Sequence, residues 1–164
     1  ATLTATLKAT LTATYTGAPD VGTLVQSIAY AAQASLSNGT GANQANAPWA
    51  DTRALSASSS ENLDLAGGLT DAFGTALTFT KIKAVIIEAD DANANDVVVG
   101  GAASNAWLAP FGDALKVKPG GFIMLVAPDA NGLAVTAGTG DILKVANGGS
   151  GTSVTYTVTL VGVV

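Results

Sequence analysis

Hydrophobic and polar residues alternate strictly along the first 16 positions of the chain. Even positions carry Thr, with Lys8 as the one exception, and odd positions carry apolar residues. A period of two places the apolar side chains on one face of a β-strand. At about 3.3 Å per residue, this strand would extend roughly 50 Å, far beyond an ordinary strand. The apolar positions are Ala1, Leu3, Ala5, Leu7, Ala9, Leu11, Ala13 and Tyr15.

Two arrangements fit so long a strand. It is either an edge strand of the sheet in its own domain, or an arm whose Ala/Leu face docks on a neighbouring subunit. The sequence Gly-Ala-Pro-Asp at residues 17–20 ends the alternation. We therefore predict an extended N-terminal arm over residues 1–21 and a folded domain over residues 22–164. The candidate contact residues on the arm are Leu3, Leu7, Leu11 and Tyr15.

A second alternating segment follows at residues 24–36, where Leu24, Ile28 and Tyr30 share one parity. Its Ala-rich centre also fits a short helix, but Ser and Gln fill the other parity and no cap precedes it, which favours a strand. Residues 37–48, rich in Gly and Asn, are predicted to form a loop.

The rest of the chain is a series of short alternating segments separated by turns. Residues 53–65 and 75–89 each predict a strand, with a bulge or kink near Lys81 where the parity changes. Turn signals about every 8–12 residues are typical of a sandwich or barrel. We count about ten strands and no helix. The predicted fold is all-β, a jelly-roll-like antiparallel β-sandwich preceded by the arm. The alternative is an immunoglobulin-like sandwich of seven strands.

Composition narrows the function. Only 12% of residues are charged and 5% are aromatic, so we expect a thin core and a surface partly buried by other subunits. The chain has no His and no Cys, which excludes Ser-His-Asp catalysis, Cys/His zinc sites and disulfides. The formal net charge is −5, with no basic patch for nucleic acid. No apolar stretch is long enough to span a membrane, and a start at Ala1 fits cytoplasmic synthesis with Met removal.

The segment DDANAND (90–96) is the best candidate for a metal site. Asp91, Asn93 and Asn95 match the first three ligand positions of a calcium loop. Asp96 stands where such a loop needs Gly, and Ala102 stands where it needs a bidentate carboxylate. We therefore predict a solvated hairpin loop that uses Asp and Asn for their turn chemistry, and no metal.

No set of residues predicts catalysis. The candidate carboxylates lie beside turns or strand ends and have no second catalytic type at a suitable spacing, so we expect neither an enzyme nor a cofactor. Trp49 and Trp107 lie near loops, where they either stack on sugars or anchor the core or a subunit contact. The carboxylates considered were Asp51, Glu61, Asp64, Asp71 and Asp113.

Residues 38–164 resemble small structural proteins of tailed bacteriophages and prophages, in the class of decoration or cement proteins. This resemblance implies a jelly-roll or related β fold, assembly as a homotrimer, and binding to the major capsid protein on the outside of the head. The protein would then be made in the host bacterial cytoplasm and reside on the capsid surface. The segments that carry the resemblance are NGTGANQAN (38–46), WADTRALSASSSENLDL (49–65), LTDAFGTALTFTKIKAVII (69–87), VVVGGAASNAW (97–107), VKPGGFIMLVAPDANGLAVTAGTGDILKVAN (117–147) and TYTVTLVGVV (155–164).

Two other function classes stay open. A tail or fibre component of the same particles would show similar segments. A carbohydrate-binding adhesive module would expose aromatic side chains around one loop cluster. The expected site residues for a subunit or capsid contact are the four arm residues together with Trp49 and Trp107.

Overall fold

A computed structural model describes all residues from Ala1 to Val164. The chain forms fourteen β-strands, more than the ten or so predicted, and no helix, as predicted. Consequently, no helical segment that could cross a membrane is present. The strands are β1 (Ala5–Gly17), β2 (Leu24–Asn38), β3 (Gln44–Ala45), β4 (Ala47–Leu55), β5 (Ser60–Asp64), β6 (Ala66–Thr70), β7 (Ala76–Thr78), β8 (Lys81–Ala89), β9 (Val97–Val99), β10 (Leu115–Val117), β11 (Phe122–Val126), β12 (Leu133–Ala134), β13 (Ile142–Asn147) and β14 (Val154–Val163).

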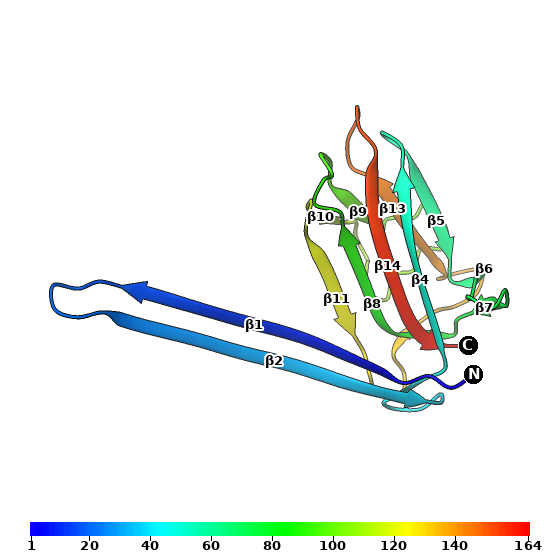
Figure 1. Cartoon of the computed structure of the whole chain (residues 1–164). Helices are drawn as coiled ribbons and strands as arrows, with labels where there is room; N and C mark the ends of the chain where they lie inside the picture. Colours follow the sequence, from blue (N-terminus) through cyan, green and yellow to red (C-terminus); the bar gives the residue numbers. More distant parts are fainter.

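Two antiparallel sheets build the body of the molecule (Figure 1). One has the strand order β10-β9-β13-β5, and the other has the order β11-β8-β14-β4 with β12 paired to β8. Both sheets contribute to one hydrophobic core of 24 buried residues. Strand β14 shows why the sequence folds this way, because Val154, Tyr156, Val158 and Leu160 are buried while the intervening Thr residues are only half-buried.

A long β-hairpin projects from one end of the body (Figure 1). Strands β1 and β2 pair antiparallel over their whole shared length, from Ala5↔Leu36 at the base to Gly17↔Leu24 at the tip. Residues 18–23 make the turn, and Gly22 adopts a positive φ of 82° there. At the base, β2 also pairs with the two-residue strand β3 in parallel.

This hairpin differs from the arm predicted from sequence. The predicted boundary between residues 21 and 22 falls inside the hairpin turn, and residues 24–38 pair with β1 instead of joining a sheet of the body. The segment at 24–36 is a strand, as predicted, but its partner is the arm itself. The physical reason is that two alternating segments of similar length, joined by a Gly- and Pro-containing turn, satisfy each other's backbone hydrogen bonds.

The two longest strands predicted in the body are each divided. The segment 75–89 breaks at Phe79-Thr80, so that β7 pairs with β6 in a small sheet while β8 enters the larger one. The change of parity near Lys81 therefore marks the passage between sheets. The segment 53–65 likewise turns at residues 56–59, where Ser58 has a φ of 58°.

Candidate interaction surface

The hairpin has two chemically different faces. Its register pairs the odd-numbered residues of β1 with the even-numbered residues of β2, so that these side chains share one face and the remaining side chains share the other. We call one of them the apolar face; its cross-strand pairs include Leu7↔Ala34, Ala9↔Ala32 and Leu11↔Tyr30. We call the other the Thr face; its pairs include Thr6↔Ser35 and Thr12↔Ala29. The apolar face comprises Ala5, Leu7, Ala9, Leu11, Ala13 and Tyr15 of β1 with Leu24, Gln26, Ile28, Tyr30, Ala32, Ala34 and Leu36 of β2.

The base of the apolar face is buried against the body. Leu7 and Leu36 form a second hydrophobic cluster with Ala45, Ala84 and Val161. The last two belong to β8 and β14, so the hairpin base packs on the outer face of that sheet. The cluster is completed by the partly buried residues Leu3, Ala5, Met124 and Val126.

Beyond the base, the same face has no partner within the chain. Leu11 is 55% exposed, Tyr30 is 64% exposed and Tyr15 is 76% exposed. Leu24 and Ile28 on β2 are exposed as well. Of the arm residues predicted as contacts, Leu3 and Leu7 thus lie at the junction with the body, and Leu11 and Tyr15 lie on the projecting part. Leu24, Ile28 and Tyr30 complete this surface and were not among the predicted contact residues, although their shared parity was visible in the sequence.

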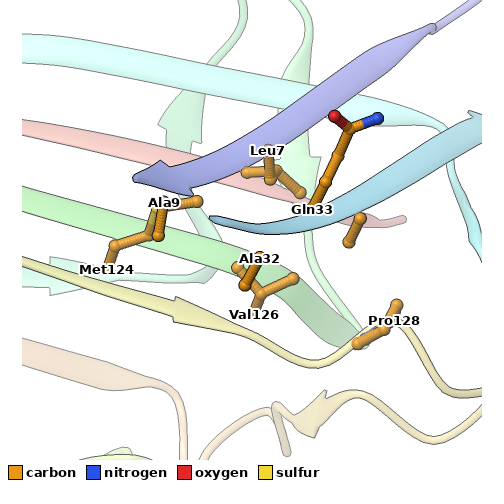
Figure 2. A pocket seen from close by; sticks show the side chains of 8 residues that line it. Leu7, Ala9, Ala32, Gln33, Met124, Val126 and Pro128 are labelled. Carbon is orange, nitrogen blue, oxygen red and sulfur yellow. The ribbon is translucent and has the colours of Figure 1, made fainter. Parts of the chain in front are cut away.

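A groove of about 360 Å³ opens where the hairpin leaves the body (Figure 2). Its hairpin wall is formed by the small residues Ala9, Ala32 and Ala34 together with Leu7. Its body wall is formed by Met124, Val126 and Pro128. Figure 2 shows Ala32 directed toward Val126, while Gln33 points to the other side of β2. Gln33 is also one of the eight residues that line the groove and the only polar one, so the other seven positions are apolar.

The two tryptophans lie in the body and away from the hairpin surface. Trp107 is almost fully buried, donates a hydrogen bond of 2.8 Å from Nε1 to the Ala134 carbonyl and packs edge-to-face with Phe111 at 5.9 Å. Trp49 is 9% exposed and joins the same core, although it also lines a groove beside β4. The sequence left three roles for these indoles: stacking on sugars, anchoring the core or anchoring a subunit contact. Both pack in the hydrophobic core, where a thin core needs large side chains.

One charged network ties the edges of the two large sheets together. The Arg53 guanidinium on β4 forms ion pairs with Asp51 at 2.7 Å and with Glu61 on β5 at 2.6 Å. The Tyr156 hydroxyl on β14 donates a hydrogen bond of 2.8 Å to Glu61 Oε1. The hydrogen bond to Glu61 raises the pKa of Arg53, and burial followed by the bond to Glu61 raises the pKa of Tyr156. These four groups are therefore each other's partners.

Lys83 is a charged residue that is buried outside the large core. The Lys83 side chain is fully buried and its Nζ donates to the Asp129 carbonyl oxygen, while the neighbouring Lys81 Nζ donates to the Ala130 carbonyl at 2.8 Å. Burial, reinforced by the charge of Lys81, lowers the pKa of Lys83. The two lysines thereby hold the loop that joins β11 to β12.

The candidate calcium loop uses its side chains to hold its own turn and to bind the neighbouring β14 and the loop before it. Asn93 makes two hydrogen bonds with the backbone of Thr155, from Nδ2 to the carbonyl at 2.8 Å and to Oδ1 from the amide at 2.7 Å. The Asn95 amide donates to Asn147 Oδ1 at 3.0 Å. Asp90 Oδ1 accepts the amide of Ala92 at 2.8 Å. No group of three or more acidic side chains converges on a point where a metal ion would lie.

Two more carboxylates considered for catalysis have turn partners. Asp64 Oδ1 accepts the amide of Ala66 at 2.8 Å. Asp71 Oδ1 accepts the amides of Phe73 and Thr75 at 2.9 Å and 2.8 Å, which fixes the turn between β6 and β7. These contacts are the Asx-turn chemistry that acidic side chains provide in loops.

Comparison of the chain with protein-family models, with curated proteins and with solved structures found no match. The hairpin, with its exposed apolar face and the groove at its base, is therefore the candidate functional site on its geometry alone.

Proposed function

We propose that the body of this protein is a jelly roll. Its eight principal strands pair in a nested order, first with last: β4 with β14, β5 with β13, β8 with β11 and β9 with β10. Such nesting is the result of folding one long antiparallel hairpin onto itself. The pairings β8·β14 and β9·β13 then join these four pairs into two sheets. Jelly rolls of eight strands are common in viral capsid and lectin domains.

We propose that the protein is a non-enzymatic virion structural protein that binds the outside of a tailed-phage capsid and stabilises it. The observation that carries this proposal is the projecting hairpin, whose apolar face is exposed beyond its base. A two-stranded ribbon in water is at best marginally stable without a packing partner. The hairpin therefore suits a chain that works within an assembly, and the resemblance of residues 38–164 to phage decoration proteins indicates which assembly.

The two faces of the hairpin suggest how such a protein would attach. The apolar face contacts other copies of the chain, and the Thr face contacts the major capsid protein. Thr hydroxyl groups can hydrogen-bond to polar groups of the capsid surface even where water remains in the interface. A homotrimer would present three such contacts at once. Linked contacts that are individually weak gain strength through their high effective concentration, and this makes attachment firm without a deep pocket.

Sedimentation with capsids tests this proposal. The purified protein is mixed with heads of the encoding phage that lack it, and with complete particles whose sites are filled. We expect it to sediment with the lacking heads at a fixed ratio to the major capsid protein, and to raise the temperature at which those heads break open. Binding only to tails or fibres would instead assign it to the tail, and binding to glycans without binding to particles would make it an adhesive module.

A further inference from the structure

We propose that the exposed part of the apolar face is covered by a second copy of this chain, with Leu11 and Tyr30 of one copy seated in the groove at the hairpin base of the next. This inference rests on the proposed function, which turns the apolar face toward other copies, and deepens it by naming the residues of that contact. The contact would form between purified chains with or without a capsid.

The exposed face is too large and too apolar to stay in water. Leu11, Tyr15, Leu24, Ile28 and Tyr30 form a row of exposed large side chains on it, interspersed only with Ala13 and Gln26. Aromatic side chains alone contribute about 150–250 Å² each when buried, so the row approaches the roughly 800 Å² per partner of a standard interface. Soluble monomers rarely expose an apolar patch of that size, and its usual meaning is a protein interface.

The chain itself shows what kind of surface fits this face. At the hairpin base, Leu7 and Leu36 already pack on the outer side of the sheet formed by β8 and β14. The groove lies directly beside this contact, and Leu7 belongs to both. A second copy seated in the groove would therefore extend an apolar contact that the fold has already begun.

The apolar face of the hairpin carries both a hollow and a protrusion that could fit into the same hollow on another copy. The pair Ala9↔Ala32 is small on both strands and makes a hollow, whereas the next pair on the same face, Leu11↔Tyr30, is large on both strands. A groove of about 360 Å³ is at the lower end of cavities that hold small ligands, and it admits two such side chains. Because knob and hollow lie on one ribbon, a chain cannot fill its own groove. The complementarity of this hollow to the Leu11↔Tyr30 pair favours another copy of the chain as its occupant.

Charge does not oppose this contact. The first 50 residues contain only two charged side chains, Lys8 and Asp20. Lys8 lies on the Thr face opposite Gln33, and Asp20 lies in the hairpin turn. The apolar face and the groove carry no charge, so two copies bring no like charges together although each chain has a net charge of −5. A contact of Leu11 and Tyr30 in the groove joins two different patches, and such contacts form a ring where the rotation between copies closes and an open filament where it does not.

The mass of the purified protein in solution tests this inference without any capsid. We expect the wild-type chain to form an oligomer, and the double variant Leu11→Asp/Tyr30→Asp to be monomeric with an unchanged circular dichroism spectrum. The matched control, Thr12→Asp/Ala29→Asp, places the same charges on a cross-strand pair of the Thr face and should keep the wild-type mass. A wild-type chain that is monomeric at all concentrations would overturn the inference, as would an oligomer that survives the Leu11/Tyr30 change.

Cross-linking identifies the occupant of the groove. The chain has no cysteine, so single introduced thiols are unambiguous. Leu11→Cys protein mixed with Met124→Cys protein should give a disulfide-linked pair on mild oxidation, whereas Thr12→Cys mixed with Met124→Cys should give little. An equal yield from both mixtures would place the neighbour elsewhere and contradict the assigned groove. Loss of capsid binding by an intact oligomer would instead count only against the proposed function.

Discussion

The hydroxyl of Tyr156 and the carboxylate of Glu61 connect the two sheets of the body through one hydrogen bond of 2.8 Å. Tyr156 is fully buried in β14, whereas Glu61 belongs to β5 in the other sheet. Because Glu61 also holds Arg53, this single carboxylate joins three strands.

Replacing Tyr156 by Phe should lower the free energy of unfolding by about 1–2 kcal/mol, since Glu61 loses a donor while the ring still fills the core. The variant should also change how the free energy of unfolding depends on pH in the alkaline range. The pKa of Tyr156 is raised in the folded state, so its contribution is complete below the ordinary value of 10.0 and declines as pH rises above it, because only the unfolded chain releases the proton.

Urea unfolding from neutral pH to strongly alkaline pH measures both effects. The wild-type chain should lose stability above pH 10, and Tyr156→Phe should lose less over the same interval. Tyr15→Phe is the matched control, because Tyr15 is 76% exposed near the hairpin tip and is not one of the two residues seated in the groove, so loss of its hydroxyl should leave the curve unchanged. Identical slopes for wild type and Tyr156→Phe would show that the buried hydroxyl does not control alkaline unfolding.

Leu7 should anchor the hairpin to the body. Leu7→Ala removes a buried side chain at the junction and should lower the free energy of hairpin opening by about 2–3 kcal/mol. Thr6→Ala changes the neighbouring, exposed position on the Thr face and should have an effect within about 0.5 kcal/mol. Hydrogen exchange of the β1 and β2 amides measures local opening separately from unfolding of the body. Equal protection in both variants would mean that the hairpin is held by its own strand pairing alone.

Asn93 should act as a structural clamp and not as a metal ligand. Asn93→Ala leaves the Thr155 amide without its partner and should lower the free energy of unfolding by about 1–3 kcal/mol. Asn62→Ala, at an exposed position in β5, is the control and should be nearly neutral. Calcium and chelator should both leave the melting temperature of the wild-type chain unchanged. A rise in melting temperature with calcium that disappears in Asn93→Ala would restore the calcium-loop hypothesis.

Gly162 should tolerate no side chain. A Cβ there would lie 2.5 Å from the Lys81 carbonyl oxygen and 2.9 Å from the Phe79 ring, at the irregularity where β14 shifts register against β8. Gly162→Ala should therefore cost about 1–3 kcal/mol of stability. Gly17→Ala meets no atom within 4 Å and should be neutral or stabilising by up to about 1 kcal/mol. Thermal unfolding of both variants measures these changes in stability. A Gly162→Ala variant as stable as the wild-type chain would show that the backbone at the register shift can move to make room for the added methyl group.

The sequence was informative where one face of a strand is buried in the body. In β14 the alternation of Val154, Tyr156, Val158 and Leu160 with Thr identified both the strand and its core face, because a half-buried strand must alternate. Changes of parity were informative as well. The change near Lys81 predicted an irregularity, but alternation alone does not distinguish a kink from a passage between two sheets.

The pairing of the hairpin strands is a feature that strand periodicity does not encode. The alternation of residues 1–16 and the shared parity of Leu24, Ile28 and Tyr30 were both visible, yet strand periodicity carries no information about which strand pairs with which. The long turn at residues 18–23 lacks the two-residue Asn-Gly or Asp-Gly signal of a tight hairpin, so the partnership of β1 and β2 was missed. The buried indole of Trp107 donates its hydrogen bond to Ala134, 27 residues away, and no local pattern encodes that partner.

The hairpin projects from one end of the body, and the opposite end carries only loops (Figure 1). The two ends therefore differ as positions for attaching a foreign peptide. The hairpin root lies beside Val164, whose amide and carbonyl are held by the Asn46 side chain (Figure 1). At the opposite pole the loops after β4, β8 and β13 hydrogen-bond to one another, with Ser58 donating to Gly149 and Asn95 to Thr152. A foreign peptide inserted after Ser150, at the exposed tip of the last loop, would be displayed away from the hairpin, whereas a fusion at Val164 would crowd its root.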